Sequence, residues 1–152
     1  MKLVQEAKED RSKFFPLLNL ADESKEMISK YIHSGTLHTV WTKEKRIGII
    51  LLIEKDAQTI EIKNLGILEE FRGKGMGKRA LELITDYLKG KEYKKMIVGT
   101  ANSSIGNLIF YQKCGFRMNA VEKDFFLSYP HPIIENGLRA YDMVMLEKKI
   151  DK

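Results

Sequence analysis

Three glycines at alternate positions, Gly73, Gly75 and Gly77, follow an apolar segment of alternating pattern that ends near Leu68. A pattern typical of an amphipathic helix begins directly after them. Glycines let a backbone approach a ligand closely, and the free N–H groups at the start of a helix attract anions. The spacing therefore predicts a strand, a loop and a helix that together hold a phosphate group.

The charges around these glycines support the same interpretation. Arg72, Lys74, Lys78 and Arg79 crowd the loop and the first helical turn, where no acidic residue occurs. Cations at the start of a helix oppose its dipole and cost roughly a few tenths of a kcal/mol each. A bound anion offsets that cost. A solvated basic turn is the alternative interpretation.

The composition limits the possible classes of protein. The chain has 152 residues, of which 43% are hydrophobic, and we expect one domain over residues 1–152. Its formal net charge of +5 suits an anionic ligand. The sequence has no helix-turn-helix, no zinc-binding pattern and no interleaved aromatic and basic residues, so we expect no nucleic-acid partner.

The cysteine and the histidines do not predict a metal site. Cys114 is alone, so neither an intrachain disulfide nor a cysteine metal cluster is possible, and His33, His38 and His131 are widely separated. The chain begins without an apolar signal segment and has no apolar run of about 18 residues. We expect a cytoplasmic protein, monomeric or homodimeric, that does not bind membranes.

The elements before the glycines are predicted from periodicity and turn residues. Residues 1–7 suit a short strand, and residues 8–20 suit a helix interrupted at Pro16. Asp22 is the expected N-cap of a helix that ends near Ile32. Strands are expected over residues 36–42, 46–54 and 58–68, and the short turns between them favour an antiparallel meander.

The elements after the glycines alternate between helix and strand. The helix is expected to run from Met76 to near Gly90, and residues 96–98 suit a short buried strand. Ser104 is the expected cap of a second helix, which ends at Gly115. Two more strands, over residues 116–126 and 139–147, surround a loop over residues 128–137. This order predicts an α/β or α+β fold with a mixed sheet.

Two motifs in this order resemble those of the GCN5-related N-acetyltransferase (GNAT) superfamily, which transfers an acetyl group from acetyl-coenzyme A to an amine. The first is the pyrophosphate loop, matched by the six residues from Arg72 to Gly77. The second is a strand, a helix carrying Tyr111, and Gly115-Phe116. The resemblance covers nearly the whole chain. It implies a mixed, mostly antiparallel sheet of about six to seven strands, flanked by about four helices and splayed at the acetyl-coenzyme A slot.

The resemblance also assigns contacts to the cofactor. Leu65 and Ile67 would pair through their backbones with the pantetheine arm, along a strand that has a bulge in this family. Ser104 stands where many members have an asparagine, and Asn107 follows it. The coenzyme A pyrophosphate would be held by the backbone N–H groups of Arg72, Gly73, Lys74, Gly75, Met76, Gly77 and Lys78.

Two residues match catalytic positions of the family. Tyr111 falls where many members have a tyrosine that protonates the departing thiolate, and its alternative role is packing within the helix. Glu61 falls where several members have a basic glutamate, and its alternative role is a surface carboxylate paired with Lys63. Tyr129, His131 and Glu135 lie in the loop that the family places near the acceptor, although a plain hairpin connection explains them equally well.

The resemblance therefore predicts an acyltransferase that uses acetyl-coenzyme A and no metal. The acetyl group would pass directly to a primary amine of a small molecule or peptide in a ternary complex. The sequence does not identify this acceptor, and the candidates include a polyamine, an amino acid, an aminoglycoside-like drug and a protein amine. An alternative function is a catalytically weak sensor or regulatory module that binds acetyl-coenzyme A with the same fold.

Overall fold

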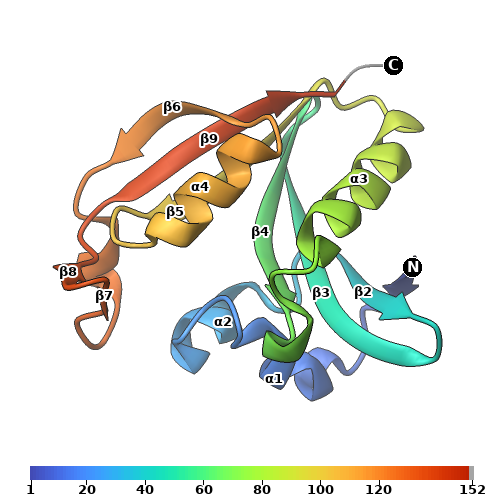
Figure 1. Cartoon of the computed structure of the whole chain (residues 1–152), viewed down its shortest axis with the longest axis horizontal. Coiled ribbons are helices and arrows are strands. Elements are labelled where there is room, and N and C mark those ends of the chain that lie inside the picture. Colours follow the sequence, from blue (N-terminus) through green and yellow to red (C-terminus); the bar gives the residue numbers. More distant parts are fainter. Residues whose placement is uncertain (151–152) are drawn as a thin grey trace.

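The computed structural model of the chain describes residues 1–150 and is built on a seven-stranded sheet in the order β1-β2-β3-β4-β5-β9-β6 (Figure 1). The sheet strands are β1 (Lys2–Glu6), β2 (Thr36–Thr42), β3 (Lys45–Asp56), β4 (Thr59–Ile67), β5 (Lys95–Ala101), β6 (Arg117–Glu122) and β9 (Met143–Lys149). The helices are α1 (Phe15–Leu18), α2 (Lys25–Tyr31), α3 (Met76–Lys89) and α4 (Ile105–Lys113), with 3-10 turns η1 (Arg11–Phe14), η2 (Glu69–Phe71) and η3 (Phe125–Ser128).

The pairing of the strands confirms the predicted mixed, mostly antiparallel sheet. Strands β1 to β4 pair antiparallel in sequence order, and β9 pairs antiparallel with both β5 and β6. Strands β4 and β5 are parallel, as the intervening helix α3 requires. The predicted meander of β2, β3 and β4 is confirmed. Among residues 1–150, no helix combines the length and the apolar character that a membrane crossing requires.

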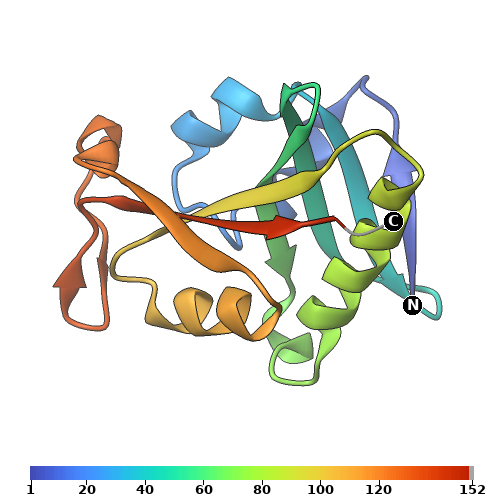
Figure 2. The same cartoon turned by 90° about the horizontal axis from the view of Figure 1, so that it is seen from above.

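Helices cover both faces of this sheet, as Figure 2 shows. The sheet divides the core into two clusters, one on each face. On one face, α3 and α4 pack against the central strands through residues that include Ala80, Ile84 and Tyr111. On the other face, α1 and α2 pack through residues that include Leu18 and Ile28. The sheet is therefore the common wall of two apolar layers.

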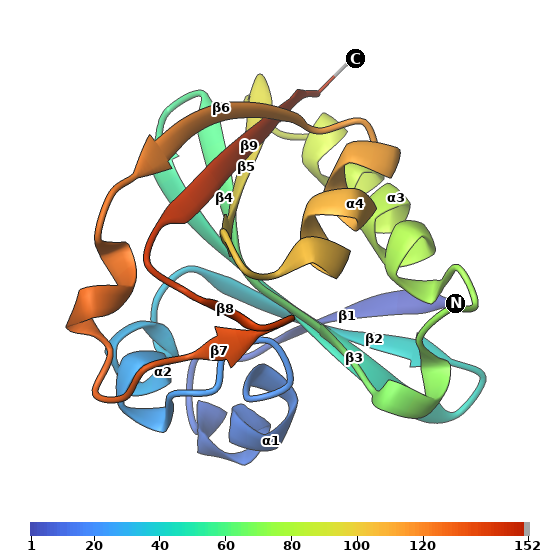
Figure 3. The same ribbon diagram turned by 60° about the vertical axis from the view of Figure 1, so that its left-hand side comes forward.

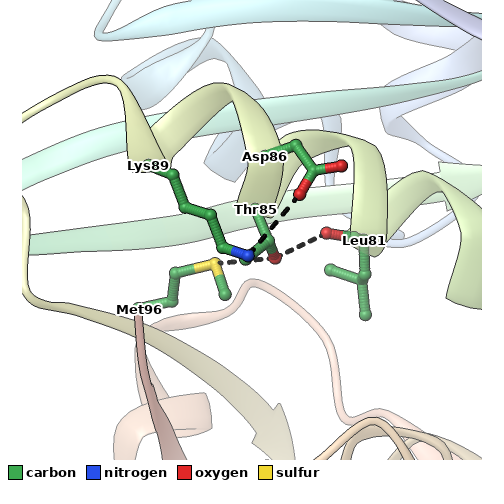
Figure 4. Close-up of polar contacts among 5 residues, drawn as sticks. All are labelled: Leu81, Thr85, Asp86, Lys89 and Met96. Carbon is green, nitrogen blue, oxygen red and sulfur yellow. Dashed lines mark hydrogen bonds and ion pairs between the residues drawn. The ribbon is translucent and has the colours of Figure 1, made fainter. Parts of the chain in front are cut away.

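A polar contact adds to the packing of α3 against β5 (Figure 4). The Thr85 hydroxyl donates to the Leu81 carbonyl at 2.7 Å and lies 3.8 Å from the Met96 sulfur. Back-bonding of this kind satisfies the hydroxyl within its own helix. The ion pair between Lys89 and Asp86 one turn later is exposed at 3.8 Å and adds little. Packing therefore positions α3, whose first turn borders the candidate site.

The segment before β2 differs from the predicted helices in one respect. The predicted interruption at Pro16 is confirmed, because η1 precedes α1 and the proline occupies the first turn of α1. The predicted Asp22 cap is wrong: Ser24 is the N-cap of α2, and its hydroxyl accepts the Met27 N–H at 3.1 Å. Asp22 instead accepts the Ser24 N–H at 3.1 Å through Oδ1, and its Oδ2 accepts the Tyr31 hydroxyl at 2.8 Å.

A buried arginine fixes the end of α2. The guanidinium of Arg11 is 1% exposed and donates to the carbonyls of Ile32, Ser34 and Gly35 at 2.7–3.0 Å. These carbonyls lie at and just beyond the C-terminus of the helix, where a cation is favoured. Arg11 therefore anchors η1 to the end of α2 and closes this layer over the sheet.

The predicted loop over residues 128–137 contains regular structure. Strands β7 (Ile134–Glu135) and β8 (Leu138–Arg139) form a small hairpin around Asn136 and Gly137, both of which have positive φ. Two residues per strand are too few for a hydrophobic period, so the sequence pattern does not reveal them. The hairpin lies at the end of the molecule far from the N-terminus (Figure 2).

A buried histidine makes the stability of this fold sensitive to pH. His38 on β2 is 2% exposed, neither ring nitrogen has a hydrogen-bond partner among residues 1–150, and the ring packs edge-on against Tyr87 at 4.8 Å. Burial lowers the pKa of His38 from 6.5 to about 4. Between these two values the unfolded chain binds a proton that the folded chain does not.

We therefore expect the free energy of unfolding to fall by up to about 3 kcal/mol as the pH drops from 6.5 to 4, with no further loss from this group below pH 4. Urea unfolding at pH 7, 6 and 5 measures the effect. The variant His38→Leu should lose most of this slope, whereas His33→Gln, at an exposed position, should keep it. An unchanged slope in His38→Leu contradicts the assignment.

Candidate active site

The sheet opens between β4 and β5, the two central strands. The first parallel pair joins Thr59 to Lys95, and the last joins Ile62 to Val98. Beyond that pair the two strands are not paired with each other, although β4 continues to Ile67 and β5 to Ala101. Figure 1 shows the two strands diverging from their paired end. The second half of β4 thus has a free edge. The splay that the family resemblance implied is confirmed by these pairs.

The free edge of β4 presents the backbone groups of Leu65 and Ile67. The Leu68 N–H donates to the Ile47 carbonyl of β3 at 2.8 Å. Backbone groups of alternate residues point to the same neighbouring strand, so the N–H and carbonyl groups of Gly66 also point toward β3. Leu65 and Ile67 face the other way, toward the opening. The Arg72 Nε donates to the Ile67 carbonyl at 2.9 Å, which shows that this oxygen is accessible from the glycine loop.

The bulge implied for β4 is also present. Asn64 pairs with Leu51 and Ile62 pairs with Leu52, so Lys63 is an extra residue on β4. A bulge of this kind bends the strand and interrupts the alternation of its side chains. Lys63 is also the first residue after the last β4–β5 pair, so the bulge and the opening of the sheet occur together.

The glycine loop and α3 form an open anion-binding terminus. Gly73 and Gly75 have φ values of 72° and 77°, in the left-handed region that disfavours other residues. Gly75 is the N-cap of α3 and has no side chain to bond the first N–H groups, and the first turn contains no acidic residue. Within residues 1–150, the N–H groups of Met76, Gly77 and Lys78 therefore have no hydrogen-bond partner and point out of the helix.

The third glycine has a different role from the first two. A Cβ atom on Gly77 would lie 3.1 Å from the Phe110 ring of α4, whereas a Cβ atom on Gly73 or Gly75 would meet nothing within 4 Å. Gly77 thus allows α3 and α4 to pack closely at the mouth of the opening. The sequence pattern grouped the three glycines, but packing against α4 separates their functions.

Tyr111 lies on α4 within the core face of the sheet. It is 6% exposed and packs edge-on against Phe110 at 5.1 Å and Phe116 at 5.5 Å. Among residues 1–150 its hydroxyl has no hydrogen-bond partner, and burial raises its pKa well above the ordinary value of 10. The phenol therefore keeps its proton at neutral pH and has a free donor.

The start of α4 is tied to the small hairpin. Ser104 is the N-cap residue as predicted, but its hydroxyl bonds to no helical N–H and instead donates to Glu135 Oε1 at 2.7 Å. The Asn136 side chain donates to the Ser103 carbonyl at 2.8 Å. Asn107 is exposed on the outer side of α4. The partnership of Ser104 with Glu135 joins residues 31 positions apart, which no local pattern reveals.

Glu61 lies at the closed end of the opening. The backbone of Glu61 still pairs with Ile97 of β5, and the Glu61 carboxylate is 3.8 Å from the ammonium of Lys55. The side chain is 12% exposed. The structure therefore pairs Glu61 with Lys55 rather than with Lys63. The role of Glu61 as a base stays a prediction.

A polar and aromatic cluster lies on the opposite face of the sheet from Tyr111. Asp22 accepts the Tyr31 hydroxyl at 2.8 Å and the Tyr129 hydroxyl at 3.3 Å. This second contact joins the turn before α2 to the segment after η3, and Figure 3 shows α2 and η3 side by side. The ring of Phe125 stands near the bulge, 6.0 Å from the ammonium of Lys63. Tyr129 was expected near the acceptor from its loop position, whereas Asp22 and Tyr31 were not.

Cys114 is a buried thiol at the end of α4. Cys114 is the C-cap of α4, and burial raises the pKa of its thiol above the ordinary value, so it is poorly suited to accept an acyl group. Among residues 1–150, no three His, Cys, Asp or Glu side chains are grouped so that they could hold a metal ion.

Comparison with known proteins identifies the family. The model of the "Acetyltransferase (GNAT) family" matches residues 3–116. The uncharacterised N-acetyltransferase YvbK of Bacillus subtilis is 37% identical over 144 residues, which cover 94% of this chain and 93% of that protein.

Solved structures of relatives share this fold, and two of them hold acetyl-CoA or CoA. A GNAT family acetyltransferase from Elizabethkingia anophelis with acetyl-CoA bound is 39% identical, covers 97% of both chains and superposes with a TM-score of 0.90. A Bacillus subtilis acetyltransferase in complex with CoA is 38% identical, covers 99% of this chain and 100% of that one, and has a TM-score of 0.84. These relatives confirm the predicted acyltransferase class. This chain belongs to the GNAT family of acetyltransferases.

Proposed function

We propose that the protein transfers the acetyl group of acetyl-coenzyme A to a primary amine by direct attack in a ternary complex. The observation that carries this proposal is the opening of the sheet after Ile62 and Val98, between an uncapped helix N-terminus and the free hydroxyl of Tyr111. The relatives from Elizabethkingia anophelis and Bacillus subtilis bind acetyl-CoA and CoA, respectively.

The residues around the opening suit each part of acetyl-coenzyme A. The pyrophosphate would accept hydrogen bonds from the first N–H groups of α3, beside the exposed cations Arg72, Lys74 and Lys78. The amide groups of the pantetheine arm would pair with the free edge at Leu65 and Ile67, as an added strand does. This arrangement directs the thioester along β4 toward the bulge.

The proposed reaction exchanges one bond for another at the acetyl carbon. The amine nitrogen attacks the thioester carbonyl, a C–N bond forms, and the C–S bond breaks. The departing sulfur takes a proton from the Tyr111 hydroxyl, and the new amide nitrogen loses one proton to a base. The buried Cys114 thiol favours this direct route over an acyl-enzyme.

Release of free thiol from acetyl-coenzyme A in the presence of a panel of amines tests this function. We expect amine-dependent thiol release together with coenzyme A binding in calorimetry. Tight binding without turnover for any amine indicates the sensor function instead. Absence of coenzyme A binding contradicts both.

The proposed base role of Glu61 has its own test. The variant Glu61→Gln should lower the rate at pH 7 by about tenfold to a hundredfold, because it removes the carboxylate that would accept the amine proton. The loss should shrink at high pH, where more of the acceptor arrives unprotonated. The variant Lys55→Met removes the 3.8 Å ion pair but keeps the carboxylate, and serves as the control. A pH–rate profile of unchanged shape in Glu61→Gln assigns the base to water or another group.

A further inference from the structure

The bulge on β4 places two consecutive side chains on the same face of the sheet. The Lys63 ammonium lies 5.4 Å from the centre of the Tyr31 ring, and the Asn64 side chain donates to the Tyr31 hydroxyl at 3.1 Å. Neighbouring residues of a regular strand point to opposite faces, so the bulge is what brings both to Tyr31. This face is opposite to the one that holds Tyr111.

Asn64 has an unused hydrogen-bond acceptor. Its side-chain nitrogen donates to the Leu18 carbonyl at 2.9 Å, and because a carbonyl can only accept, this contact fixes which way the amide points. The amide oxygen, Oδ1, is then left without a partner among residues 1–150, although Asn64 is 4% exposed. This oxygen has almost no accessible surface, so the half-buried Lys63, rather than Asn64, is the residue of this pair that a ligand can reach.

Lys63 has unused donors and an uncompensated charge. Among residues 1–150 no carboxylate lies within 4 Å of its ammonium, which contacts only the ring faces of Tyr31 and Phe125. The nearby Asp22 carboxylate already accepts from the Ser24 N–H and from the hydroxyls of Tyr31 and Tyr129. Glu135 accepts from Ser104. The cluster therefore lacks a negatively charged acceptor next to Lys63.

The proposed path of the pantetheine arm ends near Lys63. Lys63 is the first residue past the last β4–β5 pair, at the point toward which the free edge directs the pantetheine arm. Tyr111 lies on the other face, where the departing sulfur needs its proton. An amine that approaches from the Lys63 face thus attacks opposite the side from which the thiolate leaves.

We propose that the acceptor is an α-amino acid with an apolar side chain. Its carboxylate pairs with the Lys63 ammonium, and its amine attacks the thioester beside the bulge. An α-amino acid has a carboxylate and an amine on one carbon, so pairing of the carboxylate with Lys63 holds the amine next to the opening of the sheet. Its side chain would pack against the half-buried rings of Phe125, Phe126 and Tyr129, which contact one another at 5.0–6.2 Å. This inference rests on the proposed acetyltransferase function.

Kinetics with matched acceptors test the inference. Thiol release is measured with the common amino acids, with the amide of each, and with spermidine. We expect kcat/KM to be at least about tenfold higher for apolar amino acids than for their amides, because the amide lacks the charge that Lys63 pairs with. The variant Lys63→Met should remove this preference by lowering kcat/KM for the acids and leaving the amides nearly unchanged.

Two further variants separate charge recognition from general effects. Lys63→Glu should make the amides better acceptors than the acids, whereas Lys30→Met removes the same charge from an exposed site on α2 and should change neither. Equal use of acids and amides, or a preference for spermidine, overturns the inference but leaves the acetyltransferase function standing. Thiol release with none of these amines contradicts the proposed function itself.

Discussion

Replacing Tyr111 with phenylalanine is expected to lower kcat by about a hundredfold while KM for acetyl-coenzyme A changes little. The phenol is the buried donor on the α4 face of the opening, and the variant keeps the ring that packs against Phe110 and Phe116. The change therefore removes the proton that the departing thiolate needs and leaves the packing intact. Because burial raises the pKa of Tyr111 above 10, ionisation of this group should not limit the rate at any pH below that value.

Steady-state kinetics at saturating amine measure both constants. Tyr87→Phe is a suitable control, since Tyr87 lies on α3 and its hydroxyl makes a long contact of 3.4 Å with Gln5. That variant should retain nearly full kcat. A loss in Tyr111→Phe that is confined to KM contradicts the role of this hydroxyl as an acid and leaves it a binding role.

Replacing Gly75 with valine is expected to weaken coenzyme A binding by about a hundredfold. Apart from its chain neighbours, no atom of residues 1–150 lies within 4 Å of the added Cβ, so the effect does not come from a clash with the protein. It comes from the φ value of 77°, which a β-branched residue does not readily adopt. The loop must then turn differently, and the first N–H groups of α3 no longer converge on one anion.

Calorimetric titration with coenzyme A measures this loss, and thermal unfolding reports any change in stability separately. Gly75→Asn should bind better than Gly75→Val, because asparagine tolerates the left-handed conformation. Gly90→Ala changes a glycine at the other end of α3, where φ is −79°, and should bind normally. Equal affinity of Gly75→Val and the unaltered protein refutes the assignment of the pyrophosphate to this loop.

Features that depend on local pattern were predicted well from the sequence. The bounds of β2 agree residue for residue, because its alternation ends at a short charged turn. Helix α3 begins at Met76 and ends next to Gly90, since a loop of glycines precedes it and a glycine follows it. The pairs between β4 and β5 end at Ile62 and Val98, so the sheet splays as the family resemblance implied.

Features that depend on distant contacts could not be predicted in this way. Asp22 and Ser24 are both good capping residues two positions apart, and which one caps α2 is decided by where the chain packs. Asp22 bonds to Tyr129, 107 residues away, and Ser104 bonds to Glu135, so both roles arise from tertiary structure. The orientation of the Asn64 amide likewise depends on Leu18, which is 46 residues earlier.

The division of the core by the sheet has a consequence for how such an enzyme changes over time. Tyr111 belongs to the cluster on the α3 and α4 face, whereas Tyr31 belongs to the separate cluster on the α2 face. With the acceptor bound as proposed, substitutions around Tyr31, Phe125 and Tyr129 would alter which molecule is modified, while the core around Tyr111 on the other face keeps its packing. The preference for an acceptor and the residues that carry out acetyl transfer would then change independently of one another within the same fold.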